Sequence, residues 1–148
     1  MKIKILLIFL LVLIISGILF VLNQTKNRGI NKVSTATEKN IYSAQISSDE
    51  EIDVETTPSV SSDKKTWSFQ ITLTTHSGSL DEDLVELTTL ESNDGEMLKP
   101  LNWEGSPPGG HHREGNLIFP PFSKIPKSVT LTIQGVGDVE RTFTWNVE

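Results

Sequence analysis

The sequence predicts an all-β fold for the C-terminal part of the chain, on three observations. Residues 67–74 alternate apolar and polar side chains without a break, which is the pattern of a strand with one buried face. The same alternation returns over residues 129–133 and 143–147. Turn signals separate the strand candidates at residues 93–95, 107–110, 120–121 and 135–138. Six or seven short strands at this spacing are typical of an immunoglobulin-like β-sandwich, and an open barrel is the alternative.

The predicted strands should share one core, because all three tryptophans of the chain lie within residues 65–148. Counting every second residue places eight side chains in this core: Trp67, Phe69, Ile71, Leu73, Leu131, Ile133, Phe143 and Trp145. Residues 84–90 are a weaker strand candidate, followed by a hairpin signal at Asp94 and Gly95. Residues 79–84 can form one helical turn, with Ser79 as its N-cap and acidic residues in its first turn.

The N-terminal part of the chain predicts a membrane anchor. After a short N-terminus of residues 1–4, residues 5–22 form an apolar run of eighteen residues, long enough to cross a bilayer as a helix. Only Ser16 and Gly17 interrupt the run, and no small-x-small cleavage site follows it. We therefore expect an uncleaved, single-pass signal anchor, with a cleavable signal peptide as the alternative.

The charges around the apolar run predict that the C-terminal domain lies outside the cytoplasm. Lys2, Lys4 and the α-amine favour a cytoplasmic N-terminus, although Lys26, Arg28 and Lys32 on the other side weaken the asymmetry. Residues 23–64 are polar, contain one aromatic residue and lack a sustained period, so they predict a flexible linker before the domain at 65–148. Residues 54–60 can still add an edge strand, where Pro58 is tolerated.

Charge and composition exclude several classes of protein. The chain of 148 residues has a net charge of −6, and residues 65–148 alone hold six basic and twelve acidic residues. Such a surface repels phosphate backbones, so we expect no nucleic-acid partner. The absence of cysteine excludes disulfides, thiolate metal sites and a lipid-modified N-terminal cysteine.

One segment of the domain stands out chemically. Trp103 and Gly105 precede a proline- and glycine-rich stretch that leads into Gly109, Gly110, His111 and His112, and the third histidine, His76, follows the first clear strand between Thr75 and Ser77. This combination of Thr-His-Ser with Trp-x-Gly…Gly-Gly-His-His-x-x-Gly-x-Leu-x-Phe resembles a small uncharacterised extracytoplasmic β-domain over roughly residues 67–147. The resemblance implies location and fold class, and it implies no activity.

The three histidines suggest two interpretations. Three neutral imidazoles make an adequate ligand set for Zn²⁺ or Cu²⁺, so His76, His111 and His112 are candidate metal ligands. Adjacent histidines on a regular strand point to opposite faces, so this site requires an irregular loop, which Gly109 and Gly110 permit. Asp81, Asp83 or Glu114 can add an oxygen ligand. The alternative is structural, with one imidazole packed against Trp103 and another facing solvent.

The sequence offers little support for catalysis. It lacks a cysteine nucleophile, a Gly-x-Ser-x-Gly elbow and a phosphate-binding glycine loop with lysine. We therefore expect no enzyme and no cofactor, but a membrane-anchored extracytoplasmic binding or structural module with an envelope protein as its possible partner. A transition-metal-binding accessory protein is the alternative, and a hydrolase with a metal-bound water has the weakest support.

Overall fold

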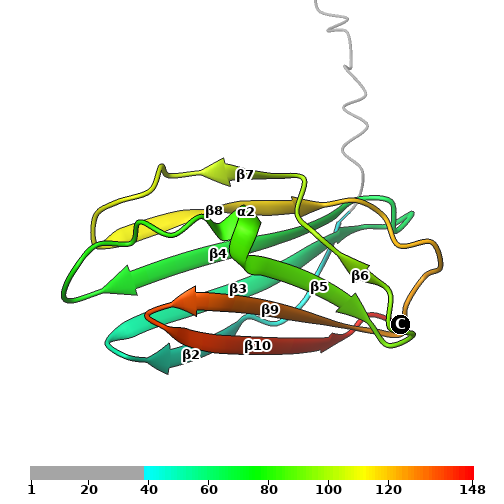
Figure 1. The fold of residues 1–148 in the computed structure, drawn as a ribbon. Coiled ribbons are helices and arrows are strands. Elements are labelled where there is room, and N and C mark those ends of the chain that lie inside the picture. Colours follow the sequence, from blue (N-terminus) through cyan, green and yellow to red (C-terminus); the bar gives the residue numbers. More distant parts are fainter. Residues whose placement is uncertain (1–38) are drawn as a thin grey trace, which may run out of the picture. The chain divides into compact units, whose positions relative to one another are not determined.

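The computed structural model describes residues 39–148, which form ten strands and one helical turn (Figure 1). The strands are β1 (Lys39–Ile41), β2 (Gln45–Asp49), β3 (Ile52–Ser61), β4 (Trp67–Thr75), β5 (Thr88–Ser92), β6 (Met97–Leu98), β7 (Asn102–Gly105), β8 (His112–Phe119), β9 (Ser128–Val136) and β10 (Val139–Asn146). The helical turn α2 (Leu84–Leu87) lies between β4 and β5. The domain is all-β, as predicted, but it has more strands than the six or seven expected.

The strands form two antiparallel sheets that face each other (Figure 1). Sheet A has the order β1-β3-β4-β8-β7, and β2 pairs with β3 beyond the end of β1. Sheet B has the order β10-β9-β5-β6. The chain passes from one sheet to the other after β4, after β6 and after β8. Two separate sheets around one core make a sandwich and not the open barrel that the sequence left as an alternative.

The core lies between the two sheets and contains all eight side chains that the sequence predicted to be buried. Each of these side chains is at most 5% exposed. Aromatic rings join the two sheets at the centre, where the centroid of Phe69 lies 5.5 Å from that of Trp145 and 5.6 Å from that of Phe119. Ring pairs at such distances add to the stabilisation that their buried area supplies.

The predicted boundary of the domain at residue 65 is wrong. Residues 39–61, which the sequence assigned to a flexible linker, form β1, β2 and β3, and β3 is central in sheet A. The inner face of β3 consists of Val54, Thr56, Pro58 and Val60, all buried. A threonine and a proline within this face, and acidic residues on the other, hide the period-2 pattern that identifies a strand.

Pro58 is tolerated in the central strand β3 because it faces the gap between β1 and β2, where the neighbouring strand is interrupted. The N–H and C=O groups of one residue in an antiparallel strand point to the same neighbour. The Pro58 carbonyl accepts a hydrogen bond from the Tyr42 amide at 3.2 Å, so the proline nitrogen also faces the chain between β1 and β2. Because no strand pairs with Pro58 on this side, its missing N–H leaves no strand-to-strand hydrogen bond unmade.

Two local predictions around the β5–β6 hairpin had different outcomes. The hairpin itself is confirmed, and Gly95 in its turn has a φ of 85°, a conformation that favours glycine. The predicted helical turn over residues 79–84 is displaced: α2 begins at Leu84, and the Asp83 carboxylate, not Ser79, accepts from the amides of Val85 and Glu86. The strand expected from residue 84 therefore begins only at Thr88.

The predicted anchor, residues 5–22, lies outside the described residues. Within residues 39–148 no helix has the length and hydrophobicity needed to cross a bilayer. The anchor, its orientation and the extracytoplasmic location of the domain stay predictions.

Candidate binding site at the histidine tip

Two loops at one end of the sandwich carry His76 and His111, and His112 begins β8 directly after the second loop. We call residues 76–83 and 106–112 the histidine tip. Backbone hydrogen bonds join the two loops: the Thr75 amide donates to the His111 carbonyl at 2.9 Å, and the Leu80 amide donates to the Gly110 carbonyl at 3.0 Å. The Gly109 amide donates in return to the Leu80 carbonyl at 2.8 Å. Gly109 and Gly110 have φ values of 114° and 74°, so the chain is irregular at these glycines, but His112 already lies on the regular strand β8.

The buried side chain of Arg113 holds the first loop of the histidine tip, residues 76–83. Arg113 is only 2% exposed, and its Nη1 donates to the carbonyls of Leu80 at 3.0 Å and Glu82 at 2.8 Å. Its guanidinium also lies 5.7 Å from the ring centroid of Trp103, a cation–π distance. The side chain over Trp103 is therefore an arginine, and not the histidine that the structural interpretation of the sequence proposed.

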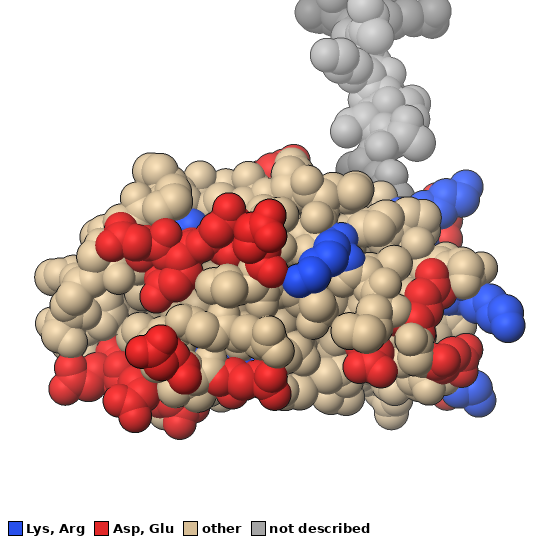
Figure 2. All heavy atoms as spheres, viewed as in Figure 1, with Lys and Arg blue, Asp and Glu red and all other residues tan. Residues whose placement is uncertain are grey.

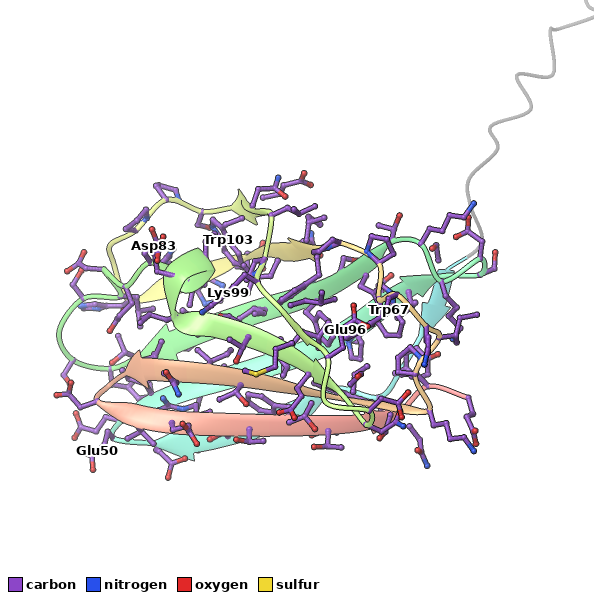
Figure 3. The ribbon with its side chains drawn as sticks, turned by 45° about the vertical axis from the view of Figure 1, so that its right-hand side comes forward. Glu50, Trp67, Asp83, Glu96, Lys99 and Trp103 are labelled. Atoms are coloured by element: carbon purple, nitrogen blue, oxygen red, sulfur yellow. The ribbon has the colours of Figure 1, made fainter. Side chains whose placement is uncertain are left out.

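The Trp-x-Gly and Gly-x-Leu parts of the sequence segment have a packing role. Gly105 of β7 pairs with Gly115 of β8, and a Cβ atom on either would lie 2.7 Å from Cζ2 of Trp103. A Cβ on Gly115 would also lie 2.5 Å from the Cα of Gly105. The indole lies against both glycines, and its Nε1 donates to the Ser106 carbonyl at 2.8 Å. Figure 3 shows Trp103 at the same end of the domain as α2 and its cap Asp83.

The histidine side chains themselves point to solvent. His76, His111 and His112 are all exposed. His112 lies opposite Thr74, whose hydroxyl is 3.2 Å from its Nδ1, and its Nε2 is 3.9 Å from a carboxylate oxygen of Glu114. Across residues 39–148, no three histidine or carboxylate side chains come together as a metal-binding group. The chain brings the histidines to one end of the sandwich without forming a closed ligand set.

A second buried arginine attaches a further turn to this end. Arg141 is 1% exposed, and it donates through Nη1 to the Val136 carbonyl and through Nη2 to the Asp49 carbonyl, the latter at 2.9 Å. The β2–β3 turn that begins at Asp49 also accepts from the histidine tip, because the Ser77 hydroxyl donates to a Glu51 carboxylate oxygen at 2.7 Å. Four segments that are distant in sequence thus meet at one end: the two parts of the histidine tip, the β2–β3 turn and the β9–β10 turn.

The surface at this end is strongly acidic. Residues 39–148 contain eight lysines and arginines against eighteen aspartates and glutamates, a net charge of −10. Eight of the carboxylates lie on or beside the four segments: Asp49, Glu50, Glu51, Asp81, Glu82, Asp83, Glu114 and Asp138. The arginines at this end, Arg113 and Arg141, are buried and donate to backbone carbonyls, not to these carboxylates. In the view of Figure 2, red atoms predominate on the left of the domain, whereas blue and red atoms lie together toward its right-hand edge.

The two buried arginines were not among the predicted core residues, although the sequence carries a signal for them. Arg113 lies four residues before Leu117 on β8, and Arg141 lies two before Phe143 on β10. Both therefore fall on the inner face by the same period-2 count that found the core. Charged residues on an inner face are uncommon, and loop carbonyls are the partners that make their burial possible.

No protein-family model, curated protein or solved structure matches this chain. The resemblance to a small extracytoplasmic β-domain stays a prediction.

Proposed function

We propose that this chain is a membrane-anchored recognition module without enzymatic activity, which presents the histidine tip to a partner in the cell envelope. In this proposal residues 5–22 anchor the protein in the cell membrane and the domain lies outside the cytoplasm. The finer fold assignment, an immunoglobulin-like sandwich, belongs to the same proposal, and three passages of the chain between the sheets support it.

One observation carries the recognition role. The backbone of the histidine tip is held in a single arrangement by Arg113 and by reciprocal hydrogen bonds between its loops, while the side chains of His76 and His111 remain exposed. Loops that are fixed before binding lose less conformational entropy when a partner arrives. Binding residues are also concentrated on loops that a rigid scaffold positions.

A photocrosslinking experiment on the full chain in its native membrane tests this proposal. A photoreactive residue at position 111 should give a discrete adduct, because this position is exposed on the histidine tip. The matched control is position 142, where Thr142 is exposed on sheet B. Arg113→Met should reduce the yield at position 111 by releasing the loop. Equal adducts from both positions, or none from position 111, would contradict a partner at the tip.

A metal-binding accessory role is the second candidate function, and the pairing of the two loops favours it. The hydrogen bond between Thr75 and His111 brings the backbone of His76 beside the other two histidines. The side chains of His76, His111 and His112 would then have to turn toward a common Cu²⁺ or Zn²⁺ ion.

Calorimetric titration with Cu²⁺ and Zn²⁺ tests the metal candidate. One equivalent should saturate the protein, and binding should weaken below about pH 6, because protons compete for imidazole ligands. Replacement of His111 or His112 by Ala should abolish binding, and replacement of His76 should weaken it. If all three variants bind metal as the unaltered chain does, the three-histidine site does not exist.

A further inference from the structure

Two exposed side chains of β8, those of His112 and Glu114, lie on the same outward face of sheet A. Positions two apart on a strand share a face, and Arg113 between them points into the core. Nε2 of His112 is 3.9 Å from Oε2 of Glu114. The three-histidine site requires side chains from separate segments to turn toward a common ion, whereas this imidazole and this carboxylate are already side by side.

The separation of these two atoms is close to that of two ligands of one metal ion. Bonds from an imidazole nitrogen or a carboxylate oxygen to Zn²⁺ are about 2.0–2.2 Å long. Two such ligands are therefore about 3.0–3.4 Å apart when they meet the ion at angles between a right angle and the tetrahedral angle. A gap of 3.9 Å closes to this range by small rotations of two exposed side chains, and the backbone of β8 does not have to move.

A hydroxyl group on the neighbouring strand holds the imidazole from its other side. Thr74 of β4 pairs with His112, and its Oγ1 is 3.2 Å from Nδ1 of the ring. With an ion on Nε2, the imidazole proton is on Nδ1, and the N–H donates to the Thr74 hydroxyl. Metal-binding histidines commonly donate their other N–H group in this way, which fixes the tautomer and the orientation of the ring.

The backbone that carries both side chains is fixed by sheet A. The strand β8 lies between β4 and β7, and there His112 pairs with Thr74 and Glu114 pairs with Thr72. The Glu114 carbonyl also accepts a hydrogen bond from the Ser106 amide at 2.9 Å. Regular strands position ligands more precisely than loops do, so little ordering is needed when an ion arrives.

The chemistry of the pair and the charge around it favour a transition-metal cation. An imidazole nitrogen suits Cu²⁺ and Zn²⁺, whereas Ca²⁺ and Mg²⁺ take oxygen ligands. The histidine tip and β8 contain no lysine, and their one arginine, Arg113, is buried. Residues 39–148 have a net charge of −10, which attracts cations to the surface. Of the two ions, Cu²⁺ binds a given set of ligands more tightly.

We propose that His112 and Glu114 bind one Cu²⁺ or Zn²⁺ ion through Nε2 and a carboxylate oxygen, with Thr74 as a positioning residue and the other positions of the ion open to water. This inference rests on the metal-binding candidate function and replaces its three-histidine ligand set. Because His76 and His111 are not ligands of this site, the two ligand sets predict opposite results for the same substitutions.

Titration of the full chain with Cu²⁺ in detergent micelles separates the two ligand sets. The double variant His76→Ala/His111→Ala leaves His112 as the sole histidine of the chain. This variant should still bind one equivalent of Cu²⁺ with the affinity of the unaltered chain, and electron spin echo spectroscopy should detect a single coordinated imidazole. The His112→Ala variant should lose this binding.

Two matched pairs of variants test the carboxylate and the hydroxyl. Glu114→Gln should weaken Cu²⁺ binding by at least about tenfold. Glu55→Gln should not weaken it, although Glu55 is exposed on the same face of sheet A and carries the same charge. Thr74→Val should weaken binding by about tenfold, the usual effect of removing a group that orients a metal ligand. Thr57→Val on β3 should leave binding unchanged, because Thr57 is paired with a residue four positions before Thr74.

The results that would overturn the inference are distinguishable. If the full chain binds no Cu²⁺, the metal-binding function and this site fail together. If the double variant loses binding, the metal-binding function stands and the ion is held by the three-histidine set. If Glu114→Gln and Glu55→Gln weaken binding equally, the effect is one of overall charge and Glu114 is not a ligand.

Discussion

At the histidine tip the loops are held from inside by arginine side chains. At the opposite end of the sandwich, residues 62–66 and 120–127, which we call the basal end, the loops are held by aromatic packing and by lysine and carboxylate side chains. Arg113 and Arg141 donate to loop carbonyls from buried positions. At the basal end Lys64 donates to the Val147 carbonyl at 2.9 Å, and Phe122 packs on Trp67. The difference shows how one domain acquires two unlike surfaces. The positive charges of the histidine tip are buried arginines, so its surface is acidic, whereas the lysines of the basal end are exposed and offset the negative charge of its carboxylates.

The largest expected effect concerns the core that both ends share. Trp145→Ala removes a side chain that is 5% exposed, contacts Phe69 and donates from Nε1 to the Ser43 carbonyl at 2.8 Å. We expect a loss of about 3–5 kcal/mol in the free energy of unfolding, measured by denaturant titration. A loss below about 1 kcal/mol would mean that Trp145 is not part of the core.

The next prediction separates the two ends. Arg113→Met keeps the length of the side chain but removes the donor to the Glu82 carbonyl, and it leaves the Leu80 carbonyl with the Gly109 amide as its donor. A buried unpaired carbonyl costs about 1–3 kcal/mol and the second lost hydrogen bond about 1 kcal/mol more, so unfolding should become easier by about 2–4 kcal/mol. Amide exchange at Leu80 should accelerate. The matched change at the basal end, Lys124→Met, should stay within about 0.5 kcal/mol because Lys124 is exposed. Equal losses from both variants would refute the contrast.

A smaller effect is expected where the tryptophan meets its glycines. The Cβ of Gly115→Ala would lie 2.5 Å from the Cα of Gly105, so β7 must move away from β8. Overpacking of this kind costs about 1–3 kcal/mol, measured as a change in unfolding midpoint. Asn116→Ala on the opposite face of the same strand is the control and should change little. A neutral Gly115→Ala would show that Trp103 does not fix the spacing of these strands.

The strands that sequence reasoning identified have an unbroken run of apolar residues at every second position of the inner face. The inner face of β4 reads Trp67, Phe69, Ile71, Leu73, and the alternation alone was sufficient. The inner face of β3 contains Thr56 and Pro58, whose burial depends on tertiary neighbours that no local pattern reveals. The same applies to the site, since the histidines were visible as residues but their pairing depends on Arg113 and on chain segments about thirty residues apart.

The smallest expected effect is at the basal end and depends on pH. The Ser123 hydroxyl, and then its amide, lower the pKa of Glu96 below its ordinary value of 4.5. A carboxyl group with a lowered pKa in the folded state contributes stability that is fully present above its unfolded pKa and is lost as the pH falls through its folded pKa.

Glu96→Gln should therefore be slightly less stable than the unaltered protein at neutral pH, and the difference should shrink as the pH falls below 4.5. The measurement is the unfolding midpoint of both proteins across this range of pH. Asp63 has a lowered pKa for a similar reason, a hydrogen bond from the Ser61 hydroxyl, so both proteins should share its acid-dependent loss of stability. A difference between them that does not change with pH would show that the Ser123 contact does not depend on the charge of Glu96.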